Sequence, residues 1–114
     1  MKIKWLDGYS KRAALIDDNG AAWVRSYNTI VARVYPNGGI DKCWDGYSKT
    51  TLKHISLALG RTISKAEWNA LPLADIYTRG AADCVSNWFD ASVGRCELID
   101  YGYGSQWYGG FVKA

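Results

Sequence analysis

Short apolar runs separated by turn-forming residues occupy the first part of the chain. Residues 12–16 and 21–25 flank an Asp-Asn-Gly turn at 18–20, and Asn-Gly supplies the positive φ angles of a tight hairpin. The arrangement recurs with residues 29–35 and 40–44 around a Pro-Asn-Gly-Gly turn. The pattern predicts two β-hairpins.

The strand expected at residues 29–35 alternates in character. Its Ile30, Ala32 and Val34 are predicted to share one face, which suits a hydrophobic core, whereas the intervening residues form a mixed face. An antiparallel sheet covered on one side only follows from this alternation.

The apolar period changes to that of a helix in the middle of the chain. Leu52 and Ile55 recur on one face of a predicted helix over residues 49–59. Ser48 before it is a good N-cap, and Gly60 after it is a good stop.

Two further helices are predicted after Gly60. Ser64 and Glu67 have the spacing of a capping box, and Pro72 closes the short helix that they start. A third apolar stripe comprises Ala82, Val85, Trp88 and Phe89, with Gly94 as its stop.

The chain ends with a predicted closing strand pair at residues 95–99 and 106–112. The order of strands, helices and strands predicts an α+β fold, with an antiparallel sheet of about four to six strands packed by two or three short helices. At 114 residues the chain fits a single domain over residues 1–114.

Composition and charge exclude one class of protein. The 14 basic and 11 acidic residues give a net charge of +3, which excludes an acidic DNA mimic and is too mild and mixed to be a nucleic-acid signature on its own. Six Trp and eight Tyr against two Phe supply aromatic rings that carry a polar group, which suits a contact face as well as a core.

The chain shows no targeting segment or metal-binding cysteine pattern. Its N-terminus has no apolar run of the signal-peptide or membrane-spanning type, so we expect a cytoplasmic protein without membrane contact. The three cysteines, Cys43, Cys84 and Cys96, are odd in number and lack CxxC spacing. They are expected to be reduced, mostly buried thiols.

The pentapeptide Asp-Gly-Tyr-Ser-Lys occurs twice, at residues 7–11 and 45–49. A strand pattern follows the first copy and a helix pattern the second, and a repeat array needs about three copies for stability. We therefore favour reused turn chemistry, in which Asp-Gly turns the chain and Ser caps it, over two equivalent binding sites.

Two stretches of the sequence match motifs of a known family. Residues 26–32 match a Ser-Tyr-x-Thr-x-Val-Ala strand, and residues 47–55 contain a Tyr-Ser-x-Thr-Thr-x-Lys-His helix start. In these elements, about a third of the chain, the sequence resembles a family of small uncharacterised proteins found largely in phages and prophages. The resemblance implies a viral or prophage origin and a small accessory protein that acts on a host component, without implying an activity.

Candidate catalytic chemistry is sparse. His54 is the only histidine, so any imidazole-dependent mechanism would have to use it, together with a thiol whose proximity the sequence does not show. A polar role on the helix surface is the simpler interpretation of His54. We expect no catalytic residue, no metal site and no cofactor, because neither paired ligands nor a phosphate loop is present.

Two groups of residues are candidates for binding. A basic helix face could hold an anion such as a phosphate, although such lysines can equally be a solvated surface; it comprises Lys49, Thr50, Lys53 and His54, extended by Arg61 and Lys65. An aromatic C-terminal group could anchor a protein interface or stack on bases; it comprises Tyr101, Tyr103, Trp107 and Tyr108.

The preferred hypothesis is a non-enzymatic phage or prophage accessory protein that binds and inhibits a host protein or nucleoprotein complex, such as a defence nuclease, in the manner of an anti-CRISPR protein. The alternative is a small nucleic-acid-binding module that uses the basic helix face and aromatic side chains. An enzyme ranks third. Exposed aromatic rings and an open sheet edge would also suit a homodimer.

Overall fold

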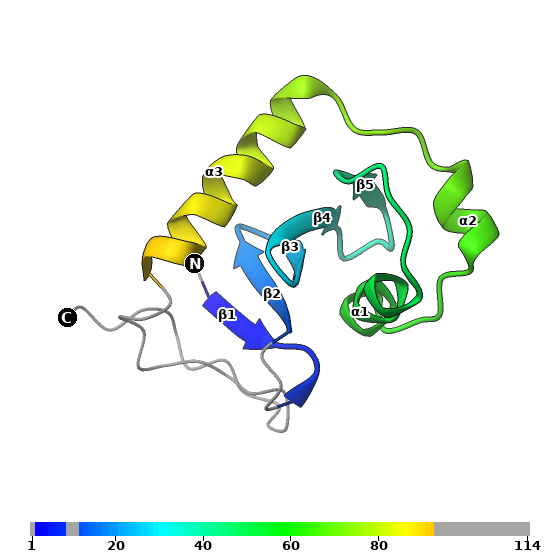
Figure 1. Ribbon diagram of the computed structural model, residues 1–114, viewed down its shortest axis with the longest axis horizontal. Helices are drawn as coiled ribbons and strands as arrows, with labels where there is room; N and C mark the ends of the chain where they lie inside the picture. Colours follow the sequence, from blue (N-terminus) through cyan, green and yellow to red (C-terminus); the bar gives the residue numbers. More distant parts are fainter. Residues whose placement is uncertain (1, 9–11, 93–114) are drawn as a thin grey trace.

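The computed structural model describes residues 2–8 and 12–92. Five strands form one antiparallel sheet in chain order, followed by three helices (Figure 1). The strands are β1 (Lys2–Trp5), β2 (Ala13–Asp18), β3 (Ala21–Ser26), β4 (Thr29–Val34) and β5 (Ile40–Lys42). The helices are α1 (Lys49–Leu59), α2 (Lys65–Ala70) and α3 (Ile76–Ser92). The predicted α+β class is confirmed.

Local turn chemistry forms both predicted hairpins. Between β2 and β3, Asn19 and Gly20 have φ values of 51° and 87°, the left-handed conformation that such a turn requires. Between β4 and β5, Gly38 has a φ of 89°. Both hairpins are therefore confirmed.

Strand β1 was not predicted from the sequence. Its Ile3 and Trp5 are buried whereas Lys2 is exposed, so the alternation that identifies a strand is present but spans only four residues. Pairing with β2 stabilises it, with Ile3 opposite Ile16.

The sheet is covered on both faces. Helix α3 lies over one face, and α1 with α2 lies on the other side of the sheet (Figure 1). The cluster beneath α3 includes Ile3, Trp5, Ile16, Trp23, Ile30, Val85 and Phe89. The cluster on the other side includes Val24, Ala32, Val34, Ile55, Ile63 and Trp68. The expectation of a half-covered sheet is wrong, because the third helix closes the second face.

A β-bulge in β4 overturns the predicted alternation of that strand. Val24 pairs with Ala32 and Arg25 pairs with Ile30, which leaves Val31 without an opposite residue in the ladder. One extra residue reverses which side the following positions face. Ile30 therefore joins the cluster beneath α3, whereas Ala32 and Val34 join the cluster near α1.

Capping side chains determine where the first two helices begin. Ser48 Oγ accepts a hydrogen bond from Thr51 N at 2.9 Å, and Gly60 ends α1 in the left-handed conformation, so the predicted helix over residues 49–59 is confirmed. Ser64 Oγ accepts from Glu67 N at 3.0 Å and starts α2.

A buried lysine holds α2 against the sheet. The ammonium of Lys42 donates to the carbonyl oxygen of Trp68 at 3.2 Å and lies 5.0 Å from the centre of the Trp68 ring. Trp68 is itself almost fully buried, and its indole Nε1 donates to Gly46 O at 3.0 Å. These contacts fix the loop that carries α1.

Several sequence predictions lie outside the described residues. They are the closing strands at 95–99 and 106–112, the thiol of Cys96, and the aromatic group Tyr101, Tyr103, Trp107 and Tyr108. Of the helices in the described ranges, none has the length and apolar character needed to span a bilayer.

Candidate functional site

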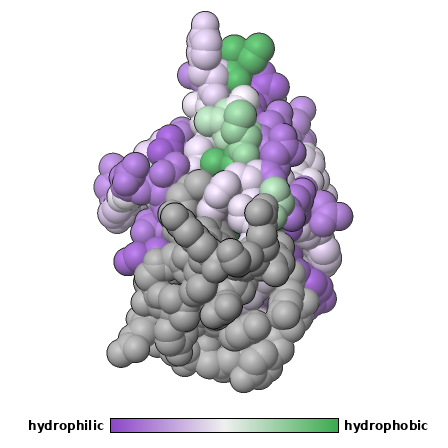
Figure 2. Space-filling view, turned by 90° about the vertical axis from the view of Figure 1, so that its left-hand side faces the viewer, coloured by the Kyte–Doolittle hydropathy of each residue, from purple (hydrophilic) through white to green (hydrophobic). Residues whose placement is uncertain are grey.

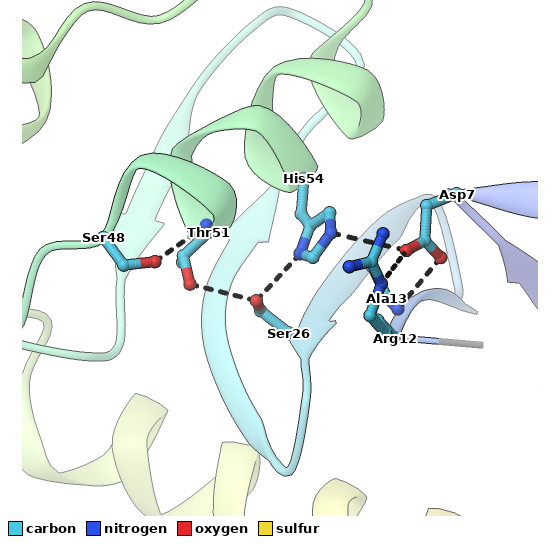
Figure 3. Close-up of polar contacts among 7 residues, drawn as sticks. All are labelled: Asp7, Arg12, Ala13, Ser26, Ser48, Thr51 and His54. Atoms are coloured by element: carbon cyan, nitrogen blue, oxygen red, sulfur yellow. Dashed lines mark hydrogen bonds and ion pairs between the residues drawn. The ribbon is translucent and has the colours of Figure 1, made fainter. Parts of the chain in front are cut away.

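A polar cluster lies inside the molecule where the β1–β2 loop, the end of β3 and the inner face of α1 meet (Figure 3). It consists of Asp7, Ser26, Thr51 and His54, with Ser48 and Arg12 at its two ends. We call Asp7, Ser26, Thr51 and His54 the His54 network. Thr51, His54 and Ile55 recur at the helical spacing that places them together on the buried side of α1.

Both ring nitrogens of His54 face oxygen atoms. Nδ1 lies 2.9 Å from Ser26 Oγ, within hydrogen-bond distance, and Nε2 lies 3.6 Å from Asp7 Oδ2, which is an ion-pair distance only. The His54 side chain is 1% exposed. Burial lowers the pKa of His54; Asp7 opposes this effect, and the cations of Arg12 and Lys53 reinforce it.

Further hydrogen bonds extend the network at both ends. Ser26 Oγ also lies 3.0 Å from Thr51 Oγ1, and either hydroxyl can be the donor. On the other side, Asp7 Oδ1 accepts from Ala13 N at 3.3 Å and Oδ2 accepts from Arg12 Nε at 3.2 Å. The network thereby ties the β1–β2 loop and β3 to α1.

The contacts of His54 overturn its expected surface role. The ring points into the molecule and not toward solvent, so the prediction that His54 serves the helix surface is wrong. Its nitrogens face a serine and a carboxylate, and neither Cys43 nor Cys84 contributes a thiol to this network in the described part of the chain. A buried hydroxyl shared with Thr51 suits a structural cross-link better than a nucleophile.

The two described thiols have different environments. Cys43 is half-buried, and burial raises the pKa of its thiol to about 11, so it is protonated near neutral pH. Cys84 is exposed on α3, which corrects the expectation of mostly buried thiols. Among the described residues, no group of three His, Cys, Asp or Glu side chains is placed to hold a metal ion.

The structure divides the predicted basic helix face. Lys49 and Lys53 are exposed and one helical turn apart, and Thr50 beside them is half-buried. His54 is turned inward and is not part of this surface.

The other two basic residues already have contacts on α2 and its neighbours. Arg61 pairs with the Glu67 carboxylate through two hydrogen bonds of 3.1 and 2.9 Å, and this contact raises the pKa of Arg61 and lowers that of Glu67. Lys65 lies 4.7 Å from the centre of the Tyr47 ring. Both side chains therefore already have a partner within the molecule.

Two exposed residues near the basic face of α1 were not predicted from the sequence. Arg12 precedes β2, and its side chain is 54% exposed beside Asp7. Tyr27 lies in the β3–β4 turn, 47% exposed, with a φ of 56°. The strand implied for residues 26–32 is therefore wrong, because a turn at Tyr27 and Asn28 divides it between β3 and β4. Asn28, a common turn residue, was the available signal.

The described parts of the two Asp-Gly-Tyr-Ser-Lys copies have different roles. Asp7 of the first copy accepts a hydrogen bond from Ala13 N across the β1–β2 loop and belongs to the His54 network. Ser48 of the second copy caps α1. Gly8 has a φ of 68°, but Gly46 does not share this left-handed conformation. The difference argues against two equivalent sites. The expected turn at the second copy is wrong, because residues 43–48 run into α1 without a turn.

Large apolar side chains are exposed where α3 begins. Leu73 is 39% exposed, Ile76 70% and Tyr77 85%, and we call these three residues the α3 tip. Figure 2 shows apolar atoms at the top of the face along which α3 runs, with hydrophilic atoms on both sides. An exposed apolar group with a polar border is typical of a contact surface.

Comparison with known proteins assigns a family. No curated protein and no solved structure matches the chain. A family model described as a family of unknown function, DUF8033, matches residues 4–75, which include the His54 network and end before α3. Because the match covers more than half of its length, the chain belongs to the DUF8033 family.

Proposed function

We propose that this chain is a non-enzymatic phage or prophage accessory protein that binds a host macromolecule in the host cytoplasm and inhibits it. The proposed target is a defence nuclease, in the manner of an anti-CRISPR protein. The observation that carries the binding function is the α3 tip, with Ile76 70% and Tyr77 85% exposed. The phage origin and the host target rest on the resemblance of residues 26–32 and 47–55 to phage proteins.

The α3 tip has the composition of an interface anchor. Tyrosine is one of the side chains that supply most of the binding free energy at interfaces, and the exposed Ile76 beside Tyr77 adds apolar area that a partner can bury. Polar groups border the tip: Asp75 Oδ1 accepts from Thr78 N at 2.8 Å, and Arg79 Nε donates to Ala74 O at 3.0 Å. These bonds hold the first turn of α3, so the tip is presented on an ordered helix end.

The His54 network supports a role without bond-making chemistry. The only histidine of the chain is 1% exposed, and its ring nitrogens face Ser26 and Asp7. Its contacts explain the histidine as a cross-link between α1, β3 and the β1–β2 loop. Nothing more is needed to account for its place in the sequence.

The test is a double substitution in the α3 tip. Immobilised wild-type protein should retain a host nuclease from bacterial lysate, and the purified nuclease should lose its cleavage activity as the protein is added. Ile76→Asp with Tyr77→Asp should weaken binding by about 100-fold or more, because both anchors are lost. Added acids in the first turn of a helix favour the helix, so folding should be retained.

The matched control is Asn87→Asp, which places an acid on an exposed position of the same helix. It should retain wild-type binding and inhibition. Recovery of nucleic acid alone, or equal inhibition by the double variant, would refute the proposal. Light scattering of the isolated protein separates self-association from host binding, since a dimer formed through the tip would dissociate in the double variant without any host component.

A further inference from the structure

A second surface lies over the His54 network, on the α1 side of the sheet. It consists of Arg12, Tyr27, Lys49 and Lys53, and we call it the Tyr27 surface. Tyr27 N donates to Arg12 O at 2.6 Å, and the Tyr27 ring lies 5.9 Å from the His54 ring. Arg12 and Lys53 both lie close enough to His54 to lower its pKa. The exposed side chains of Arg12, Tyr27 and Lys53 therefore surround one buried imidazole.

The backbone of Tyr27 is held in an unusual conformation. Its φ of 56° lies in the left-handed region, which glycine and asparagine adopt more readily than a bulky residue. The ring does not compensate by entering the core, because the residue is 47% exposed. Strain retained for an exposed aromatic ring is a feature of binding sites.

Arg12 is oriented by a buried carboxylate. Asp7, whose side chain is 9% exposed, accepts from Arg12 Nε and also from Ala13 N, so the carboxylate is held at both oxygens. The guanidinium remains 54% exposed beside Tyr27. Asp7 is thus a positioning residue for Arg12, which loses less side-chain freedom when it contacts an external anion.

Helices α1 and α3, on opposite faces of the sheet, differ in charge. Helix α1 contains no acidic residue, and it carries Lys49 and Lys53 on its exposed side. Helix α3, on the other face of the sheet, carries Asp83 and Asp90 against one cation, Arg79, and the Asp90 carboxylate pairs with Arg25. A polyanion is therefore favoured on the α1 side of the molecule.

We propose that the Tyr27 surface binds single-stranded nucleic acid. A base stacks on the exposed ring of Tyr27, and Arg12, Lys49 and Lys53 contact the neighbouring phosphates. Single strands are favoured over duplexes because the faces of paired bases are covered by their neighbours in the stack. The inference does not depend on the α3 tip or on a host nuclease.

The contribution of stacking is tested at Tyr27 with a fluorescent oligothymidine and anisotropy at low salt. Tyr27→Asn should weaken binding by about 10- to 100-fold, since a base–aromatic stack is lost. Asparagine tolerates the left-handed backbone, so the circular dichroism spectrum should remain that of the wild type. Tyr27→Phe keeps the ring face and should bind within about twofold of the wild type.

The phosphate contacts are tested by salt dependence. Three neutralised phosphates predict a slope of about −2 for log K against log salt. Substitution of Arg12, Lys49 and Lys53 by Gln should bring this slope close to zero. Lys2→Gln is the matched control, because Lys2 is exposed and pairs with Asp17 at the far end of the β1–β2 ladder. It should leave both affinity and slope unchanged.

Three results would overturn the proposal. The first is absence of binding to the oligothymidine at low salt. The second is unchanged affinity of Tyr27→Asn, which would show that the cationic side chains bind the strand without base stacking. The third is binding of polyglutamate or duplex DNA as tight as that of the single strand, which would assign the surface to acidic proteins or to duplexes.

Discussion

At the scale of single residues, the buried His54 organises the centre of the candidate site. One imidazole lies among a serine, a threonine and a carboxylate that come from three separate parts of the chain. Its ring therefore contributes shape and hydrogen bonding inside the molecule. The exposed side chains around it, Arg12, Tyr27 and Lys53, remain available for contacts with other molecules.

The lowered pKa of His54 predicts a pH-dependent stability. In the unfolded chain the ring takes up a proton as the pH falls below its ordinary pKa of about 6.5, whereas the folded protein resists protonation because the ring is buried and Arg12 and Lys53 are near. Asp7 offsets only part of this effect. Stability from this group is therefore present above that pH and is lost as the pH falls toward the folded pKa.

Urea denaturation across this range should show the wild type weakening more steeply with acidification than His54→Gln, in which the titrating ring is replaced by a neutral amide. All carboxylates are present in both proteins, so the comparison isolates the side chain at position 54 and its contact with Asp7. Parallel curves for the two proteins would contradict the lowered pKa.

At the scale of elements, residues close in sequence determine most of the helices and turns. The Ser48 cap and Gly60 stop delimit α1, and Asn19-Gly20 forms the first hairpin turn. Longer-range contacts decide the details. In a capping box, the Glu67 carboxylate would accept a hydrogen bond from the backbone N–H of Ser64. In the structure the Glu67 carboxylate accepts from Arg61 instead.

Two glycine-to-alanine substitutions should have opposite effects on stability. Gly80 lies inside α3 with no neighbouring atom within 4 Å of an added Cβ, so Gly80→Ala should stabilise the protein by about 0.5–1 kcal/mol through the lower entropy of the unfolded chain. At Gly46, an added Cβ would collide with the indole ring of Trp44. Gly46→Ala should therefore destabilise the loop before α1.

Thermal unfolding followed by circular dichroism measures both changes, and each variant is the control for the other. A higher melting temperature for Gly46→Ala than for Gly80→Ala would show that the loop before α1 accommodates the methyl group.

At the scale of the whole molecule, α3 completes a core that the family-matched segment begins. Residues 4–75 contain β2 to β5, α1, α2 and the second half of β1, and α3 lies beyond this segment. Phe89 of α3 packs edge-on against Trp5 at 5.8 Å, and the guanidinium of Arg25 lies 4.5 Å from its ring centre. One side of the sheet thus depends on a helix outside the matched residues.

Phe89→Ala should destabilise the protein by about 3–5 kcal/mol, because it removes the largest buried α3 side chain from the cluster beneath that helix. Asn87→Ala, at an exposed position two residues earlier, should change stability by less than about 0.5 kcal/mol. Urea denaturation of both variants measures the difference. Equal midpoints would show that α3 does not contribute to the core.

The sequence by itself determined the features that depend on neighbouring residues: the two hairpins, the bounds of α1, the start of α2 and the α+β class. Turn glycines, caps and apolar periods act over a few residues, so their effect is visible in the sequence. The alternation of Ile30 and Ala32 failed because the bulge at Val31 depends on pairing with β3.

Only the tertiary structure decided the candidate site. Asp7, Ser26 and His54 are far apart in the chain, and the inward direction of His54 follows from the oxygen atoms that meet it there. The same packing brings Arg12, Tyr27 and Lys53 around His54, and it gives Arg61 and Lys65 contacts with Glu67 and Tyr47. Contacts of this kind depend on how the elements close on one another, which no local pattern specifies.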